Sequence, residues 1–166
     1  SAQPFVLAVH AAVPAANFKE FVALAKAKPG TLSFATPGAG TFQHLSGELI
    51  KQLSGIDIIH VPYKGGGQAI VDLTGGQVPA AVLGSSVVIP QARAGKVRIL
   101  AVTSGVRSAA LPNVPTLAES GLSGFDVYQS LSLLAPAKTP KEIITRLNGE
   151  ATKILMQPAV RERLET

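Results

Sequence analysis

Three short segments rich in glycine and hydroxyl residues have the composition of an anion-binding surface. They are residues 36–41 (TPGAGT), 63–67 (YKGGG) and 84–86 (GSS), and each lies between a short apolar run and the start of a helical pattern. Glycine lets backbone N–H groups approach a ligand closely. A helix N-terminus adds free N–H donors and a partial positive charge, which suit a carboxylate or a phosphate. Each segment alone is also explained as a tight strand-to-helix turn, so the anion hypothesis requires all three to lie together.

The same segments lack the motifs of nucleotide binding and of nucleophilic catalysis. Gly38 and Gly40 are not followed by the third glycine of a dinucleotide fingerprint, because position 43 is Gln. Residues 65–67 do not lead into the Lys-Ser or Lys-Thr pair of a P-loop, and residues 84–86 do not form a Gly-x-Ser-x-Gly elbow. No nucleophile, base and orienting group stand out as a set, so we expect a protein that is not an enzyme.

The histidines and isolated charges give no metal-binding pattern. No pair of histidines has the helical spacing of metal ligands and the chain has no cysteine, so we expect neither a metal nor a cofactor. His44, three residues after Thr41, either faces a ligand or locks the loop through a backbone hydrogen bond, and we favour the second role. His60 has the pattern of a packed strand histidine. Lys64 either contacts an anion or is a solvated loop lysine.

Short, continuous apolar runs predict five strands that are buried on both faces, as in a parallel sheet. They cover residues 5–10, 32–35, 56–61, 78–83 and 97–102. Helical patterns alternate with these runs, which predicts a mostly parallel, doubly wound α/β sheet. The carboxyl ends of parallel strands meet at one edge, where open α/β folds bind ligands. We therefore expect the three glycine-rich segments at that edge.

Helix-end signals are strongest at two places. Asn17 with Glu20 predicts a capping box for a helix that stops at Pro-Gly, and Thr139-Pro with Glu142 predicts a helix that runs to about residue 156. We also expect a short helix over residues 116–121, a strand over residues 131–134 and a final helix from residue 158. The apolar residues expected to face the core are Leu45, Leu49 and Leu53 in a helix over 42–53, and Ile143, Ile144, Leu147, Ala151 and Leu155 in the helix after Thr139.

Composition points to one well-buried domain. The chain has 166 residues, of which 46% are hydrophobic and 15% charged. The net charge of +5 comes from scattered lysines and arginines, which argues against nucleic-acid binding and suits an anionic small ligand. The absence of cysteine is compatible with the bacterial periplasm. Neither a signal peptide nor a membrane-spanning apolar run is recognisable.

The chain resembles the solute-binding proteins of tripartite tricarboxylate transporters, also called the Bug family. Six stretches carry the resemblance in order along almost the whole chain: residues 34–49 (FATPGAGTFQHLSGEL), 60–67 (HVPYKGGG), 72–78 (DLTGGQV), 94–104 (AGKVRILAVTS), 111–121 (LPNVPTLAESG) and 134–140 (LAPAKTP). The family implies a two-lobed, type II periplasmic-binding-protein fold that closes on a small carboxylate. Typical ligands are di- and tricarboxylates, acidic amino acids and aromatic carboxylates, taken up through membrane transporter subunits.

The resemblance also implies which residues bind the ligand. The first loop contributes backbone N–H groups and hydroxyls, the second borders the cleft and the third forms another wall. In that order they are Thr36, Gly38, Ala39, Gly40 and Thr41, with His44 beside them; Tyr63, Lys64 and Gly65; and Gly84, Ser85 and Ser86. Many family members carry an acidic or amide residue near the end of the fourth strand, where this chain reads AAVLGSS.

The resemblance further implies that the chain is a fragment of a two-lobed protein. Residues 1–124 would form the second lobe, and residues 125–166 would return to pack on the first lobe. With that lobe absent, we expect another copy of the chain to cover the exposed apolar faces as a homodimer. Two alternatives stay open: a ligand-sensing domain of a regulator, which would need an upstream helix-turn-helix, and an enzyme acting on a small anionic substrate.

Overall fold

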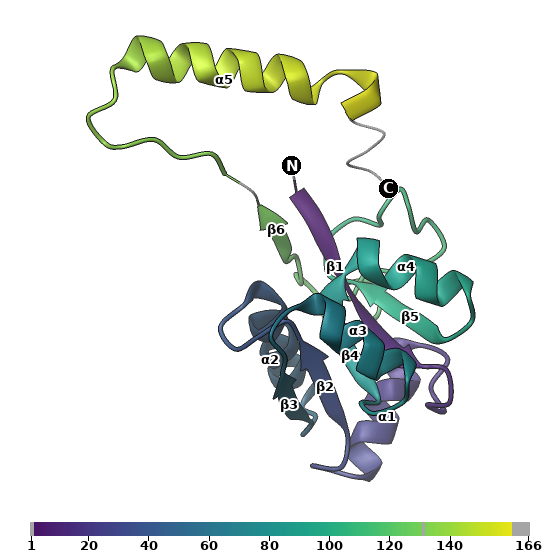
Figure 1. Ribbon diagram of the computed structural model, residues 1–166. Helices are drawn as coiled ribbons and strands as arrows, with labels where there is room; N and C mark the ends of the chain where they lie inside the picture. Colours follow the sequence, from purple (N-terminus) through teal and green to yellow (C-terminus); the bar gives the residue numbers. More distant parts are fainter. Residues whose placement is uncertain (1, 131, 161–166) are drawn as a thin grey trace. The chain divides into compact units, whose positions relative to one another are not determined.

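The computed structural model of the chain describes residues 2–130 and 132–160 (Figure 1). The chain divides into two compact units, Ser1–Ser130 and Leu131–Thr166, and each is described by itself. We expected a division at residue 124, but residues 128–130 form a strand that pairs with the first strand, so the first unit extends to Ser130. Among the described residues, no helix has the length and apolar character needed to cross a bilayer.

A six-stranded sheet forms the centre of the first unit. Its strands are β1 (Ala2–His10), β2 (Ser33–Thr36), β3 (Ile59–Pro62), β4 (Ala80–Gly84), β5 (Val97–Val102) and β6 (Tyr128–Ser130). The order is β3-β2-β4-β1-β5, with β6 paired to β1. β2 runs parallel to both β3 and β4, and the mostly parallel sheet is confirmed. β1 differs from expectation because it lies antiparallel between β4 and β5; a buried strand shows the same continuous apolar run in either direction.

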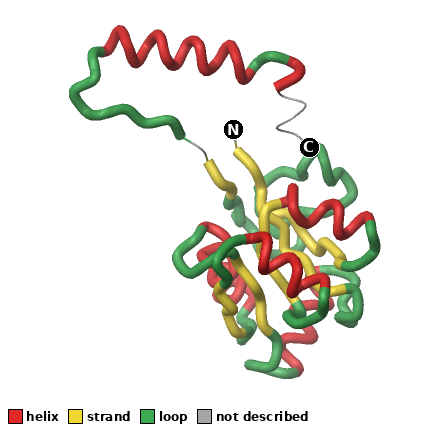
Figure 2. Tube along the Cα trace, in the orientation of Figure 1, coloured by secondary structure: helices red, strands yellow, loops and turns green. Residues whose placement is uncertain are grey.

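Helices cover both faces of the sheet, which confirms the doubly wound arrangement (Figure 2). They are α1 (Phe18–Ala27), α2 (Phe42–Ser54), α3 (Gly66–Thr74) and α4 (Ser85–Arg93). Successive side chains of a strand point to opposite faces. Phe5 of β1 accordingly packs in a cluster with Phe21 of α1 and Ile50 of α2. Val6, the next residue, belongs to the other cluster with Leu73 of α3.

The N-cap residue of α1 is the one that the sequence predicts, whereas the N-cap residue of the last helix lies one position further along the chain than predicted. The Glu20 amide donates to the Asn17 side chain at 2.9 Å, and the Glu20 carboxylate accepts the Ala16 amide at 2.7 Å. The last helix, α5 (Lys141–Leu155), is confirmed, but its N-cap is Pro140 without a side-chain hydrogen bond, rather than Thr139. Proline at that position supplies the extended φ, ψ of a cap without a capping oxygen.

The buried face of α2 agrees with the predicted one only at Leu49, which is partly buried against the core. Leu45 and Leu53 are about half exposed, at 56% and 49%, whereas Ser46, Gly47 and Ile50 are buried. A Cβ on Gly47 would lie 2.1 Å from the Phe34 ring, so this glycine is where α2 touches the sheet. The close approach of the α2 backbone to the sheet therefore decides which face of the helix is buried, and the row of leucines does not.

Three other expectations differ in the structure. Residues 117–121 form turns rather than a helix, and Thr116 makes a β-bridge to Val102, although the Thr116 hydroxyl accepts the Glu119 amide at 2.9 Å as a cap would. Residues 132–134 are not a strand, and residue 131 lies outside the described residues. No residue of α5 is buried, so its expected core side is exposed. Residues 158–160 are helical, and the rest of the expected final helix lies outside the described residues.

Candidate ligand-binding edge of the sheet

The structure brings the three glycine-rich segments to one edge of the sheet. β2, β3 and β4 are parallel neighbours, so α2, α3 and α4 all begin at their carboxyl ends (Figure 1). The first two segments are joined directly, because the Gly65 amide donates to the Pro37 carbonyl at 2.8 Å and the Tyr63 amide donates to the Thr36 carbonyl at 3.0 Å. Ala35 pairs with Ala81 in the parallel register, which aligns the start of the third segment with the first.

The two threonines of the first segment hold the loop in place. The Thr36 side chain is fully buried, and its hydroxyl lies 2.7 Å from His60 Nε2 and 3.2 Å from the Gly38 carbonyl. The Thr41 hydroxyl donates to the Gly38 carbonyl at 2.8 Å and accepts the His44 amide at 3.3 Å, which makes Thr41 the N-cap of α2. Both hydroxyls are therefore engaged within the protein and shape the loop around Gly38.

His44 and His60 form a stacked pair behind this loop. Their ring centroids lie 3.9 Å apart with an interplanar angle of 16°. His44 Nδ1 accepts the Gly40 amide at 3.0 Å, so the favoured role of His44 as a lock on the loop is confirmed. His60 packs 5.1 Å from the Phe34 ring centroid, as a packed strand histidine should. Burial, and then the charge on His44, lower the pKa of His60.

Tyr63 and Lys64 have different surroundings in the second segment. The Tyr63 hydroxyl donates to the Asp72 carboxylate of α3 at 2.7 Å, which fixes the loop to the helix that follows it. Burial and this contact raise the pKa of Tyr63 to about 12. Lys64 is exposed, and among the described residues it makes no salt bridge. The lysine is thus a cation at the edge, and the tyrosine is a positioning residue.

Backbone amides are the donors that the edge offers to a ligand. Neither α3 nor α4 has a side-chain cap, and their N-cap residues are Gly65 and Gly84. The first amides of a helix have no partner inside it. No hydrogen bond among the described residues uses the hydroxyls of Ser85 or Ser86 either. Two uncapped helix starts beside the glycines of the first loop give a surface that suits a carboxylate.

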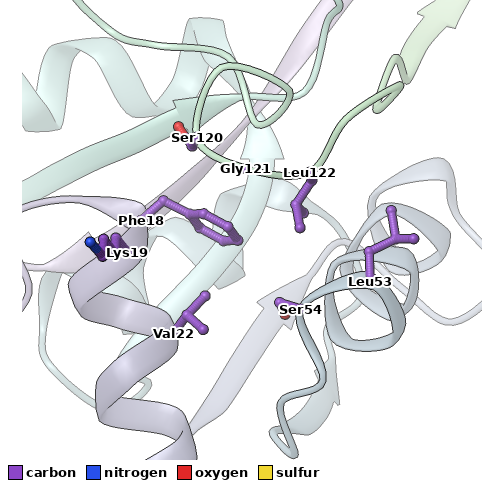
Figure 3. A pocket seen from close by; sticks show the side chains of 8 residues that line it. All are labelled: Phe18, Lys19, Val22, Leu53, Ser54, Ser120, Gly121 and Leu122. Carbon is purple, nitrogen blue, oxygen red and sulfur yellow. The ribbon is translucent and has the colours of Figure 1, made fainter.

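Two open cavities of the chain lie away from this edge. One, of about 200 Å³, lies between α1 and the end of α2 and is lined by Phe18, Val22, Leu53 and Leu122 among others (Figure 3). Because α2 begins at the candidate edge and ends at Ser54, this cavity is at the opposite end of that helix. The other, of about 330 Å³, lies beside Arg93 and Val97. At the candidate edge, Ala39, Gly40, Lys64 and Ser86 are exposed.

Sequence reasoning missed two partners that shape the site. His60 was assigned to packing alone, yet it contacts both Thr36 and His44. Asp72 was assigned to a short helix, yet it accepts the Tyr63 hydroxyl. Tyr63 and Asp72 are nine residues apart, with one loop and two helical turns between them, and this spacing is not a recognisable motif. Within the described residues, no group of His, Cys, Asp and Glu is arranged to hold a metal ion.

Comparison with known proteins gives the family. The model for the tripartite tricarboxylate transporter family receptor matches residues 1–166. Protein BugT of Bordetella pertussis is 36% identical over 159 residues, which cover 96% of this chain and 49% of that protein. An R. palustris protein solved with adipate matches with a TM-score of 0.91 and 32% identity, over 99% of this chain and 55% of that chain.

A second solved structure agrees with the first. MatC of Rhodopseudomonas palustris with bound malate matches with a TM-score of 0.86 and 32% identity, over 98% of this chain and 55% of that chain. The chain spans about half the length of the relatives that it matches. Its α/β lobe is of the periplasmic-binding-protein type, and the resemblance seen in the sequence is confirmed. The chain belongs to the tripartite tricarboxylate transporter receptor family.

Proposed function

We propose that this chain is one lobe of a periplasmic receptor that captures a small carboxylate and passes it, chemically unchanged, to a tripartite transporter in the membrane. The observation that carries the proposal is the meeting of three helix starts at one sheet edge, two of them uncapped. A carboxylate oxygen accepts such backbone amides in charge-assisted hydrogen bonds, which are stronger than neutral ones. The adipate and malate in the two solved relatives support a dicarboxylate as the ligand.

The exposure of the edge residues supports a two-lobed receptor. Ligand sites that hold small molecules tightly bury most of the ligand surface, and a single exposed edge does not. We infer that a second lobe supplies the opposite wall of the cleft and that the segment after Ser130 packs against it. The exposed apolar side chains of α5, such as Ile143 and Leu147, suit such a packing surface. A homodimer of the chain alone is the corresponding expectation when that lobe is missing.

Isothermal titration calorimetry, in which carboxylates are titrated into the full-length natural protein, tests the proposed function. The ligand panel contains adipate, malate, a tricarboxylate and an aromatic carboxylate. At least one of these carboxylates should bind. The NMR spectrum of the bound carboxylate, recorded after incubation with the protein, should be unchanged. Failure of all four to bind, or conversion of any of them, would contradict the proposal.

A proline at the first position of α4 tests the amide mechanism directly. Gly84 has φ −62° and ψ 141°, which a following proline permits, so Ser85→Pro should fold while it removes one N–H donor. Ser85→Ala is the matched control, because it removes the hydroxyl and keeps the amide. We expect Ser85→Pro to weaken binding about tenfold more than Ser85→Ala, the magnitude of a hydrogen bond to a charged group. Equal affinities of the two variants would show that the amide does not contact the ligand.

A further inference from the structure

One of the backbone amides expected to bind the ligand already donates a hydrogen bond within the protein. The Gly40 N–H donates to Nδ1 of His44 at 3.0 Å. An imidazole nitrogen that accepts a hydrogen bond carries a lone pair, so the neutral ring holds its proton on Nε2. The Gly40–His44 hydrogen bond therefore exists only while Nδ1 is unprotonated. A proton on Nδ1 would place two N–H donors face to face.

The surroundings of the stack disfavour a proton on His60. The pKa of His60 is lowered by burial and by the charge of His44, so a second proton on the stack is disfavoured. The other charged groups around the pair are Glu48 and Lys51, both from α2. Glu48 Oε1 lies 3.9 Å from His44 Nε2 and 3.2 Å from Lys51 Nζ.

We propose that His44 and the Gly40 amide form a proton-operated latch on the ligand site, so that the protein takes up a proton when a carboxylate binds. In the empty state the latch is closed by the Gly40–His44 hydrogen bond. When a solvent proton binds Nδ1, that bond breaks, and a carboxylate oxygen accepts both the Gly40 N–H and the new Nδ1–H. Each opening consumes one proton, and the ligand keeps its charge and its bonds. The latch deepens the proposed function and rests on it.

The latch predicts tighter binding at lower pH. Because the bound state holds one more proton than the empty state, affinity should rise as the pH falls across the range in which imidazoles titrate. We expect an increase of about tenfold between pH 8 and pH 6, the size of one charge-assisted hydrogen bond. Calorimetry in buffers of different ionisation enthalpy should report net proton uptake on binding of adipate or malate, whichever binds.

Two asparagine variants separate the latch from other titrations. His44→Asn replaces Nδ1 by an amide oxygen that accepts the Gly40 N–H and does not titrate, so proton uptake and the pH dependence should disappear. His10 also accepts a backbone amide through Nδ1, that of Ala12 at 3.3 Å, but it ends β1 at the opposite edge of the sheet. His10→Asn should therefore keep the pH dependence of the wild type. Equal proton uptake by wild type and His44→Asn would overturn the latch.

NMR on the ligand-free protein distinguishes failure of the latch from failure of the proposed function. The Gly40 amide resonance should shift with the titration of the His44 ring nitrogens in the wild type and stay constant in His44→Asn. A Gly40 resonance that ignores the His44 titration would refute the latch even if a carboxylate binds. A coupled titration in a protein that binds none of the panel would instead refute the proposed function, and with it the role of the latch in binding.

Discussion

Gly47 is the position where one added methyl group should cost the fold most. Substitution Gly47→Ala places a Cβ 2.1 Å from Cε2 and 2.6 Å from Cζ of Phe34, a fully buried ring. Carbon atoms in contact prefer about 3.5–4.0 Å, so α2 and β2 must move apart by more than about 1 Å. Alanine gains about 1 kcal/mol over glycine in a helix, whereas overpacking of this severity costs about 3 kcal/mol. We expect a net loss of about 2 kcal/mol of unfolding free energy.

Urea denaturation followed by circular dichroism measures this loss. Gly67→Ala is the matched control, because a Cβ at Gly67 in α3 meets no atom within 4 Å and the helical propensity alone should make the protein neutral to slightly more stable. A double-mutant cycle with Phe34→Leu tests the cause: the smaller side chain should relieve the clash, so the pair should cost less than the sum of the single variants. If Gly47→Ala is as stable as the wild type, close helix-to-sheet packing does not explain the buried face of α2.

Three further predictions concern the hydrogen bonds of the lobe. Asn17→Ala removes the N-cap of α1 and should cost about 1 kcal/mol in urea denaturation, and a change within error would contradict the cap. Thr103→Val removes a buried hydroxyl that joins β1 to the segment before β6 and leaves two backbone groups unpaired, so thermal unfolding should report a loss of about 1–3 kcal/mol. The pKa of Tyr63, raised from 10.0 to about 12, contributes stability that is fully present below pH 10 and lost as the pH rises towards 12. Ultraviolet titration should show that Asp72→Asn lowers this pKa, and an unchanged titration would exclude the carboxylate as a cause.

Local sequence signals predicted most of the elements around the candidate site. The Asn17–Glu20 capping box and the Thr41 cap involve residues three positions apart, so the chemistry that starts each helix is contained in a few adjacent residues. The glycine-rich segments likewise follow their strands closely. The parallel arrangement of β2, β3 and β4 then places those segments at one edge. The location of the three loops was therefore predictable without coordinates.

The contacts that give the site its chemistry depended on the tertiary structure. The stack of His44 on His60 and the bond from Tyr63 to Asp72 join different elements, and no sequence spacing specifies them. The buried face of α2 also depended on how closely Gly47 approaches the sheet, which a hydrophobic pattern does not encode. The sequence by itself determined most of the helices and strands around the site and which loops share an edge, because those signals are local. Only the folded chain decided which donors stay free at that edge, because their partners come from distant segments.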